Sequence, residues 1–225
     1  MCVSTVALYI INDREWPSHV FEEVIEELPH DFHEKARRFR FWNDRQAFVL
    51  GKLLIKKILN DYTNLGLKDV QYTKYGKPFV PDRISFNISH SGKYVICLFS
   101  LTKSLLGIDI EKIDSKINIS DFKEVLTHQE SLKIMNSKDQ IEAFYEIWTI
   151  KEAGMKADGR GLNIPLKEIY IDSQYVEIET TKWYYRNLFI DKEYKCHLVI
   201  DCPEFNVSVK KVKREDLTRR KLLTY

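Results

Sequence analysis

The sequence has few cysteines and no cysteine motif, which narrows the classes of protein it can be. The four cysteines are Cys2, Cys97, Cys196 and Cys202, and they show neither CxxC spacing nor the density of a disulfide scaffold. This usage disfavours a zinc site and a secreted disulfide-rich domain. We therefore expect a soluble protein of the reducing cytoplasm.

Long hydrophobic runs and a large net charge are also lacking. The longest apolar run, residues 95–101, is too short to cross a bilayer. The apolar residues 1–11 lack the basic start and the cleavage site of a signal peptide, so we predict a first strand there. The 35 Lys and Arg residues nearly balance 33 Asp and Glu residues, which argues against a dedicated nucleic-acid binder. We expect neither a membrane nor a nucleic acid as partner.

The length and composition allow a large core. With 225 residues and a hydrophobic content of 44%, the chain can form one large domain or two small lobes. No linker rich in Pro, Gly or Ser divides it, and it contains no short repeat. Each half holds helices followed by strands, which favours two similar lobes, residues 1–104 and 105–225.

Hydrophobic periodicity predicts the main elements. Apolar residues recur at helical spacing in residues 21–28, 43–60 and 140–156. Short alternating runs bounded by turn residues predict strands, which are residues 71–73, 84–88, 94–99, 169–171 and 176–178.

Two basic clusters allow more than one interpretation. Residues 33–42 combine cations with aromatic residues, so they form either an anion-binding helix or a solvated helix face with aromatic anchors. The cluster from Lys210 to Lys221, which includes Arg219 and Arg220, is interpreted as a charged terminal segment.

Two carboxylates interrupt the apolar run of residues 105–111. In a strand, Asp109 and Glu111 share one face, while Leu106, Ile108 and Ile110 occupy the other. Two neighbouring carboxylates repel each other unless a cation lies between them. Hard oxygen ligands without nearby Cys or paired His indicate magnesium, and hence phosphate chemistry. The alternative is an ordinary half-buried strand with a wet polar face.

Other polar residues near this strand are weak signals when taken singly. Ser89 and His90 do not predict a hydrolase, because adjacent residues of an extended chain face opposite ways and no acid is placed to orient the imidazole. His90 is better suited to donate a hydrogen bond to an anion. Lys77 lies between Gly76 and Pro78 and could be an ordinary turn lysine. On the helix at 140–156, Glu152 and Lys156 share one face, with Lys151 beside them.

Taken together, these blocks resemble a known family. They are Tyr75-Gly76-Lys77-Pro78 with Phe86-Asn87-Ile88-Ser89-His90-Ser91, then Gly107-Ile108-Asp109-Ile110-Glu111, then Trp148-Thr149-Ile150-Lys151-Glu152-Ala153 with Lys156. In order and sequence they resemble the 4'-phosphopantetheinyl transferases of the longer Sfp type, from about residue 35 to residue 165. The resemblance implies an α+β fold of two similar lobes related by pseudo-twofold symmetry, each with an antiparallel sheet packed on helices.

The resemblance also implies an activity. Coenzyme A would bind between the lobes as co-substrate, with Mg²⁺ on Asp109, Glu111 and Glu152. The phosphopantetheine arm would pass to a serine hydroxyl of an apo acyl or peptidyl carrier protein, with release of adenosine 3',5'-bisphosphate. We expect the enzyme to act as a monomer.

By matching motif positions, further residues receive roles. Lys151 and Lys156 would stabilise the charge that develops on the phosphates, and Lys77 and His90 would contact the phosphates with help from Ser89. Lys35 matches a basic residue that meets the adenosine 3'-phosphate. Where relatives carry a further lysine one turn earlier, this chain has Phe32-His33, and we expect Arg40 or Arg45 to compensate.

The base that takes the serine proton is left open. Glu152 is the first candidate, Glu130 the second, and a metal-bound water the third. Residues 113–123 are the candidate docking segment for the carrier protein, or else a plain surface loop. The competing functions are a Mg²⁺-dependent phosphohydrolase or nuclease, and a non-catalytic carrier-binding or nucleic-acid-binding module.

Overall fold

The computed structural model describes residues 3–218 of the chain. Residues 1–2 of the predicted opening strand, including Cys2, and the basic residues Arg219, Arg220 and Lys221 lie outside the described residues. Within residues 3–218, no helix is long and apolar enough to cross a membrane.

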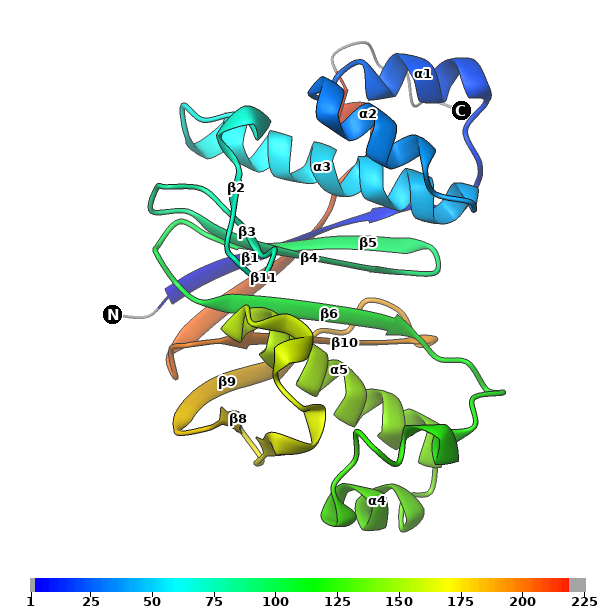
Figure 1. Cartoon of the computed structure of the whole chain (residues 1–225), viewed down its shortest axis with the longest axis vertical. Coiled ribbons are helices and arrows are strands. Elements are labelled where there is room, and N and C mark those ends of the chain that lie inside the picture. Colours follow the sequence, from blue (N-terminus) through cyan, green and yellow to red (C-terminus); the bar gives the residue numbers. More distant parts are fainter. Residues whose placement is uncertain (1–2, 219–225) are drawn as a thin grey trace.

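The first lobe packs three helices on the outer face of a sheet (Figure 1). Its elements in chain order are β1 (Val3–Ile11), α1 (Ser18–Ile25), α2 (His30–Arg37), α3 (Trp42–Tyr62), β2 (Gln71–Tyr72), β3 (Pro78–Phe79), β4 (Ser85–Ser91) and β5 (Tyr94–Ser100). The long helix α3 buries an apolar face on the sheet, and its Gly51 lies directly against Ile88 of β4. The predicted helices are confirmed, and the predicted strand at residues 71–73 pairs with β3, which was not predicted, in a two-stranded hairpin.

The second lobe repeats this plan with a longer sheet. Its elements are β6 (Leu106–Lys112), α4 (His128–Met135), α5 (Gln140–Asp158), β7 (Ile169–Ile171), β8 (Tyr175–Ile178), β9 (Thr181–Asn187) and β10 (Tyr194–Ile200). The strands form an antiparallel sheet in the order β6-β10-β9-β8-β7. Helix α5 packs on β6 and β10, as α3 packs on the first sheet. Five short 3-10 turns complete the described chain, namely Leu67–Asp69, Ile119–Phe122, Gly161–Asn163, Leu166–Glu168 and Arg214–Asp216.

The predicted α+β fold with two similar lobes is confirmed, but the first sheet departs from the prediction. Its order is β11-β1-β5-β4, and β11 (Phe205–Lys211) pairs in parallel with β1. The sheet is therefore mixed, and a strand from the second half of the sequence completes the first lobe. Phe205 on this strand is buried in a core that both sheets share. Burial of this side chain favours the placement of β11 in the first sheet.

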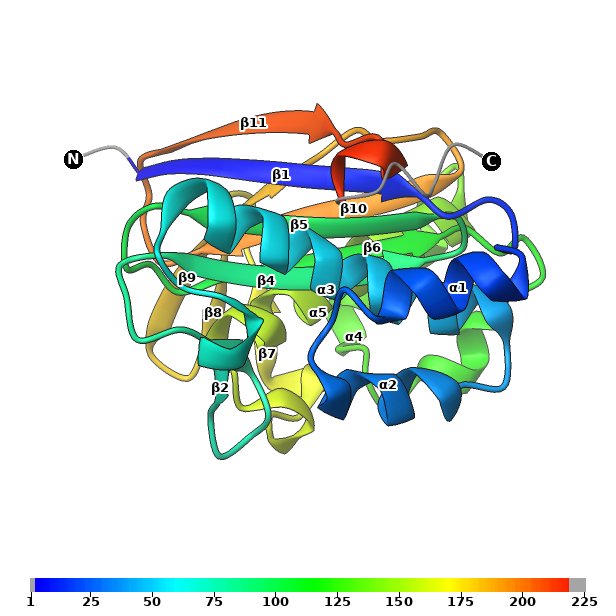
Figure 2. The same cartoon turned by 90° about the horizontal axis from the view of Figure 1, so that it is seen from above.

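The two sheets pack against each other and bury their inner faces together. This shared core contains Ala7, Ile96 and Leu98 from the first sheet and Ile108, Ile110, Leu198 and Ile200 from the second. Helices cover the outer face of each sheet, with α3 on one side and α5 on the other (Figures 1 and 2). At one edge β4 and β6 run side by side, and this edge carries the predicted functional residues.

Candidate active site

Strand β6 carries the two predicted carboxylates on its α5 side. Leu106, Ile108 and Ile110 point into the shared core, which leaves Asp109 and Glu111 on the opposite face, as predicted. Gly107 precedes them on that face, where a Cβ would lie 2.1 Å from the carbonyl oxygen of Ala153. Only glycine allows α5 to approach β6 so closely, and this approach brings Lys156 to Asp109.

Side chains of β4 join this strand to the other lobe. Three polar side chains at a spacing of two accept hydrogen bonds from successive outward N–H groups of β6: Asn87 from Ile108 (2.9 Å), Ser89 from Ile110 (3.3 Å) and Ser91 from Lys112 (3.0 Å). The outward N–H groups at the edge of the second sheet thus donate to side chains rather than to the backbone of another strand. We call this row of three hydrogen bonds the side-chain seam, and it fixes the position of β6 relative to β4.

The same serines hold the carboxylates. Ser89 Oγ donates to Asp109 Oδ1 at 2.9 Å, and Ser91 Oγ donates to Glu111 Oε2 at 2.8 Å. Ser89 was predicted to contact phosphates, whereas in the structure its hydroxyl is buried and used within the protein. Ser91 was not among the predicted site residues. The alternation of Asn87, Ser89 and Ser91 along one strand was the signal that could have identified it.

Lys156 is the cation that meets this carboxylate pair. Its Nζ lies 2.6 Å from Asp109 Oδ1 and 3.0 Å from Ser89 Oγ. Asp109 is 2% exposed, and its other oxygen, Oδ2, is buried without a hydrogen-bond partner. A buried, unpaired carboxylate oxygen is costly unless a cation or a donor reaches it.

Glu152 of α5 lies near the same pair. Burial raises the pKa of Glu111 to about 7, and the charges of Asp109 and Glu152 contribute. Burial and the charge of Asp109 likewise raise the pKa of Glu152. Across residues 3–218, however, no three His, Cys, Asp or Glu side chains form a preassembled metal cluster. Asp109 and Glu152 are close enough to Glu111 for their charges to raise its pKa, but the three predicted metal ligands do not form a complete coordination site by themselves.

His90 and Lys77 flank this group from the first lobe. His90 is at the end of β4, where partial desolvation and the charge of Lys156 lower its pKa. Lys77 Nζ donates to the carbonyl oxygens of Leu106 (3.1 Å) and Ala157 (2.7 Å), and burial lowers its pKa to about 8. Its ammonium therefore ties the β2–β3 hairpin to the start of β6 and the end of α5. The predicted phosphate contact of Lys77 stays a prediction.

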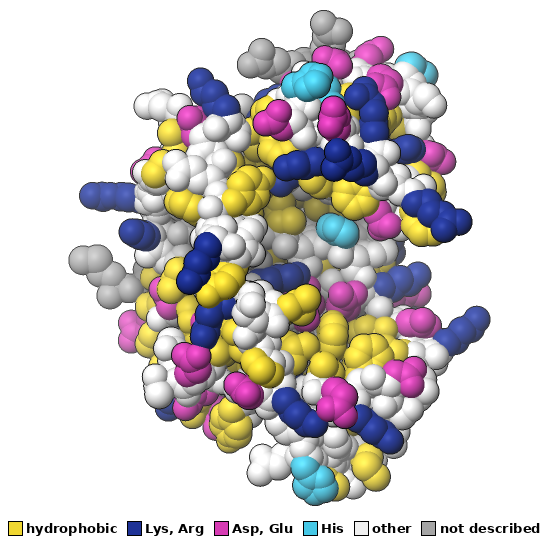
Figure 3. Space-filling view, viewed as in Figure 1, with side chains coloured by type: hydrophobic (Ala, Val, Ile, Leu, Met, Phe, Trp, Pro, Cys, Tyr) yellow, Lys and Arg dark blue, Asp and Glu magenta, His cyan; other side chains and the backbone are white. Residues whose placement is uncertain are grey.

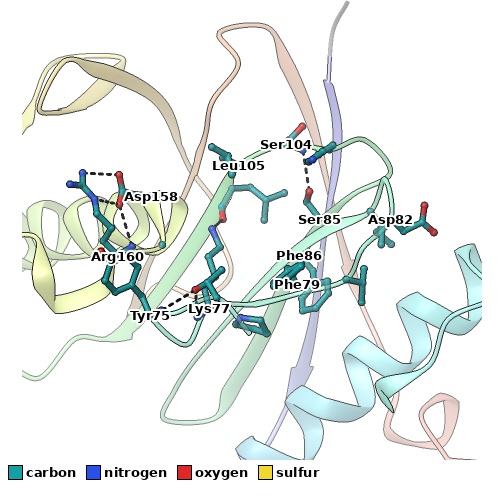
Figure 4. A pocket seen from close by; sticks show the side chains of 17 residues that line it. Tyr75, Lys77, Phe79, Asp82, Ser85, Phe86, Ser104, Leu105, Asp158 and Arg160 are labelled. Atoms are coloured by element: carbon teal, nitrogen blue, oxygen red, sulfur yellow. Dashed lines mark hydrogen bonds and ion pairs between the residues drawn. The ribbon is translucent and has the colours of Figure 1, made fainter. Parts of the chain in front are cut away.

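Two cavities meet at the Tyr75–Pro78 turn. One, of about 240 Å³, lies between the lobes and is bounded by Lys77, Glu152 and Lys156. The other, of about 350 Å³, lies behind the turn and is lined mainly by apolar side chains, among them Phe79, Phe86 and Leu105. Figure 4 shows Lys77 extending from the turn past this second cavity, with the Asp158–Arg160 ion pair to one side.

Lys151 and Glu130 are not brought to the carboxylates. Lys151 is 1% exposed, and its ammonium pairs with Glu130 at 2.7 Å and donates to the carbonyl oxygens of Val125 and Leu166. Glu130 also accepts from the N–H of Thr127 at the start of α4. Lys151 lies on a different side of α5 from Lys156. Residues five apart in an α-helix point in directions that differ by about 140° around the helix axis. In the structure both residues serve the packing of α4 against α5, and the catalytic roles predicted for them stay predictions.

Comparison with known proteins agrees with this site. Residues 105–209 match the family described as "4'-phosphopantetheinyl transferase superfamily", and residues 14–101 match "4'-phosphopantetheinyl transferase, N-terminal". The chain is 31% identical over 222 residues to 4'-phosphopantetheinyl transferase Sfp of Bacillus subtilis (strain 168), which covers 92% of this chain and 97% of that protein. This chain belongs to the 4'-phosphopantetheinyl transferase family.

Further relatives of this phosphopantetheinyl transferase bear the same description. It is 34% identical over 175 residues to 4'-phosphopantetheinyl transferase gsp of Aneurinibacillus migulanus, covering 76% of this chain and 72% of that one. Among solved structures, the holo-[acyl-carrier-protein] synthase of Thermotoga maritima aligns with 43% of this chain and 62% of its own, at a TM-score of 0.34 and 17% identity, which is too distant to support an argument.

The residues predicted to contact the adenosine 3'-phosphate, Lys35 and Arg45, lie in different surroundings in this transferase. Lys35 of α2 is exposed, with its Nζ 5.9 Å from the ring centre of Phe32. Arg45 instead turns to α1, where it stacks on the Phe21 ring (4.9 Å) and pairs with Glu15 (3.4 Å). The 3'-phosphate contacts predicted for Lys35 and for Arg45 stay predictions.

The predicted docking segment, residues 113–123, comes directly after the carboxylate strand. Its apolar side chains Ile113, Ile117, Ile119 and Phe122 pack against the core between α4 and α5. The cations Lys116 and Lys123 are exposed. The segment is thus an anchored, basic-edged loop beside the site, and its role in docking stays a prediction.

Proposed function

We propose that this transferase moves the 4'-phosphopantetheine arm of coenzyme A to a serine hydroxyl of an apo acyl or peptidyl carrier protein and releases adenosine 3',5'-bisphosphate. The observation that carries the proposal is the convergence of Asp109, Glu111, Glu152 and Lys156 beside a cavity between the lobes. Acids and a lysine in this arrangement suit the handling of a diphosphate and its charge.

Asp109, Glu111 and Glu152 would hold Mg²⁺. Their carboxylate oxygens are the hard ligands this ion prefers, and Mg²⁺ usually retains waters and substrate phosphates as its remaining ligands. An incomplete cluster of protein ligands, with one buried oxygen of Asp109 unpaired, fits that requirement. When bound, the ion neutralises phosphate charge and polarises the bond to be broken.

The chain's own residues supply position and charge. Lys156 presents its ammonium beside Asp109, where it can stabilise negative charge that grows on the phosphate oxygens. Ser89 and Ser91 hold Asp109 and Glu111 in their orientations. Prealigned groups of this kind lower the barrier because they need no rearrangement when the charge develops.

Glu152 is our candidate for the base that removes the serine proton. Burial raises its pKa, which makes the carboxylate a better proton acceptor. Glu130, the second candidate, is 8% exposed, its Oε2 pairs with Lys151, and the residue does not line the cavity between the lobes. This contrast supports Glu152.

Carrier recognition is proposed for residues 113–123. The exposed Lys116 and Lys123 would attract the acidic surface of a carrier protein and orient it beside the carboxylates. Since both lobes of one chain build the site, we propose that the enzyme acts as a monomer.

The activity is tested by incubating the protein with a fluorescent coenzyme A analogue, MgCl₂ and an apo carrier domain. We expect label on the carrier serine and none on a carrier in which that serine is alanine. Cleavage of the analogue without a carrier would instead indicate a phosphohydrolase, and binding without either reaction would indicate a non-catalytic module. Excess chelator should stop the transfer, and full activity in chelator would contradict the Mg²⁺ proposal.

Variants of the carboxylates test the site itself. We expect Asp109→Ala and Glu152→Ala each to abolish transfer while the circular dichroism spectrum stays unchanged, because they remove ligands rather than core side chains. Glu142→Ala is the matched control, since this α5 carboxylate pairs with Lys195 at the surface. Near-normal transfer by either site variant, or an equal loss in the control, would contradict the assignment.

A further inference from the structure

Strand β6 is held to the first lobe at both of its ends. At its start, Lys77 donates to the carbonyl oxygens of Leu106 and Ala157. At its end, the β4–β5 turn, formed by Gly92 and Lys93, lies against the second lobe (Figure 1). Figure 3 shows the hollow between the lobes, with acidic and basic side chains together along its second-lobe border. How firmly β6 is held decides how precisely its carboxylates are placed beside the cavity.

Tyr194, the first residue of β10, contacts the β4–β5 turn. Its hydroxyl oxygen accepts a hydrogen bond from the N–H of Lys93 at 3.1 Å. A Cβ on Gly92 would lie 2.4 Å from the same oxygen, and the φ of Gly92 is +51°, so only glycine allows the turn to lie this close. The ring of Tyr194 is buried in the shared core, where it meets the Tyr94 ring edge-on at 4.8 Å. A ring fixed in the core thus presents its hydroxyl to the backbone of the turn.

Asp191, in the loop before β10, holds the same turn through its side chains. Its Oδ2 accepts a hydrogen bond from the hydroxyl of Tyr94 at 2.9 Å and pairs with the ammonium of Lys93, also at 2.9 Å. Its Oδ1 accepts from the N–H of Glu193 at 3.1 Å. The hydrogen bonds from Glu193 and Lys93 lower the pKa of Asp191 to about 2. Lys93 is therefore held by the second lobe through both its backbone and its side chain.

The turn begins directly after Ser91, the last residue of β4, and Ser91 decides the orientation of Glu111. Ser91 Oγ donates to Glu111 Oε2 at 2.8 Å and accepts from the N–H of Lys112 at 3.0 Å. Within residues 3–218, no other group forms a hydrogen bond or an ion pair with the Glu111 carboxylate, whereas Asp109 has two partners. A displacement of Ser91 would leave Glu111 without a fixed orientation.

We propose that Tyr194 is a positioning residue for the transfer reaction. Through the β4–β5 turn it holds Ser91, and through Ser91 it keeps Glu111 in the orientation that binds Mg²⁺. This inference rests on the proposed Mg²⁺ site of Asp109, Glu111 and Glu152, and it extends that site to a residue of the shared core. Removal of a group that orients a metal ligand commonly lowers the affinity for the metal by about 10- to 100-fold.

The test is a double-mutant cycle of Tyr194→Phe and Ser91→Ala, measured as the affinity for Mg²⁺. MgCl₂ is titrated by calorimetry into the protein with saturating coenzyme A and no carrier, so that no transfer takes place, and a titration into coenzyme A alone is subtracted. Phenylalanine keeps the buried ring and removes only the hydroxyl. Tyr185→Phe is the matched control, because its hydroxyl donates to the carbonyl oxygens of Asp172 and Ser173, which follow β7 at the opposite edge of the sheet from β6.

We expect Ser91→Ala to weaken Mg²⁺ binding about tenfold and Tyr194→Phe about threefold, with no change in the control. Once Ser91 is replaced, Tyr194→Phe should cause almost no further loss, because both variants act on Glu111 through the same hydrogen bond. In carrier labelling, excess MgCl₂ should restore the transfer rate of Tyr194→Phe, which a loss of folding would not allow.

Three results would overturn the inference. They are an unchanged affinity in Tyr194→Phe, an equal loss in Tyr185→Phe, and the same loss from Tyr194→Phe whether or not Ser91 is present. If the wild type binds coenzyme A but no Mg²⁺, the proposed metal site itself fails.

Discussion

Two lysines on one helix show how residue environment decides the role of a charge. Lys151 is enclosed by Glu130 and two backbone carbonyls between α4 and α5, whereas Lys156 faces Asp109 beside the cavity between the lobes. Burial lowers the pKa of Lys151, and its partner Glu130 opposes that effect. A buried, fully partnered ammonium is a structural group, and a half-exposed one beside carboxylates is available for chemistry.

Replacing each lysine with methionine separates these roles. We expect Lys151→Met to lower the free energy of unfolding by roughly 3–5 kcal/mol, because it leaves the carboxylate of Glu130 buried without its partner. Lys156→Met should lose most transfer activity even when folded, and it should also lower the free energy of unfolding because the buried Asp109 loses its cation. Urea titration and the carrier-labelling assay measure the two effects. A stable, inactive Lys151→Met would restore the catalytic role predicted from the sequence.

His197 is a buried histidine that makes stability depend on pH. It is 2% exposed, its Nδ1 lies 2.8 Å from Thr149 Oγ1, and burial lowers its pKa from 6.5 to about 3. Between these two values the unfolded chain binds a proton that the folded chain does not. Stability from this group is therefore complete above about pH 6.5 and is lost as the pH falls towards 3.

The expected contribution is a loss of up to about 1.4 kcal/mol per pH unit below pH 6.5. Urea titrations at pH 7, 6 and 5 should give a flatter acid decline for His197→Gln than for the wild type. His30→Gln, at an exposed position, should leave the decline unchanged. Parallel declines for wild type and His197→Gln would show that this histidine does not control acid stability.

At the residue scale, local periodicity made part of the site predictable from the sequence. Asp109 and Glu111 share a face because a strand alternates, and no tertiary information was needed to place them together. The engagement of Lys151 with Glu130 was not predictable, because it depends on how separate helices pack. Ion partners across tertiary contacts leave no regular spacing in the sequence.

At the scale of elements, the approach of α5 to β6 sets the geometry of the site. A Cβ on Gly107 would lie 2.1 Å from the Ala153 oxygen and 2.5 Å from the Ala157 nitrogen, and these backbone atoms cannot move aside without shifting the helix. The same helix presents Glu152 and Lys156. Its distance from the strand therefore couples packing to catalysis.

We expect Gly107→Ala to lower the free energy of unfolding by roughly 3 kcal/mol and to reduce transfer activity, because α5 must move away from Asp109. Gly66→Ala is the control, since its Cβ would have a single neighbour at 4.0 Å and its φ of −130° suits alanine. Urea titration and carrier labelling report the two quantities. Wild-type behaviour of Gly107→Ala would show that this close approach is not required.

Helices and strands were predictable from local sequence patterns. Which strands pair with each other was not predictable. The helices α3 and α5 and the strands β4 to β6 are accounted for by hydrophobic periodicity and turn residues. The parallel pairing of β11 with β1 joins residues about 200 positions apart, and no local signal specifies it. The side-chain seam of Asn87, Ser89 and Ser91 was likewise visible only as polar alternation, without a partner strand.

At the scale of the whole molecule, the two lobes are not independent. Both sheets contribute to one buried core, β4 and β6 are joined by side-chain hydrogen bonds, and β11 belongs to the first sheet although it comes after the second in sequence. Separating the chain at the predicted boundary would expose the apolar inner faces of both sheets and remove β11 from β1. Each half would lose buried apolar area, and a lobe of about 100 residues depends on that area for its stability.

We therefore expect residues 1–104 and 105–225, produced separately, to be unfolded or aggregated, and the whole chain to unfold in a single cooperative transition. Circular dichroism of each half, and urea titration of the whole chain followed by two probes, test this. The tryptophans Trp16 and Trp42 report on the first lobe, and Trp148 and Trp183 on the second, so variants that keep one pair follow each lobe alone. Two separate transitions would mean that the shared core adds little to either lobe, and that the cleft between them can open without global unfolding.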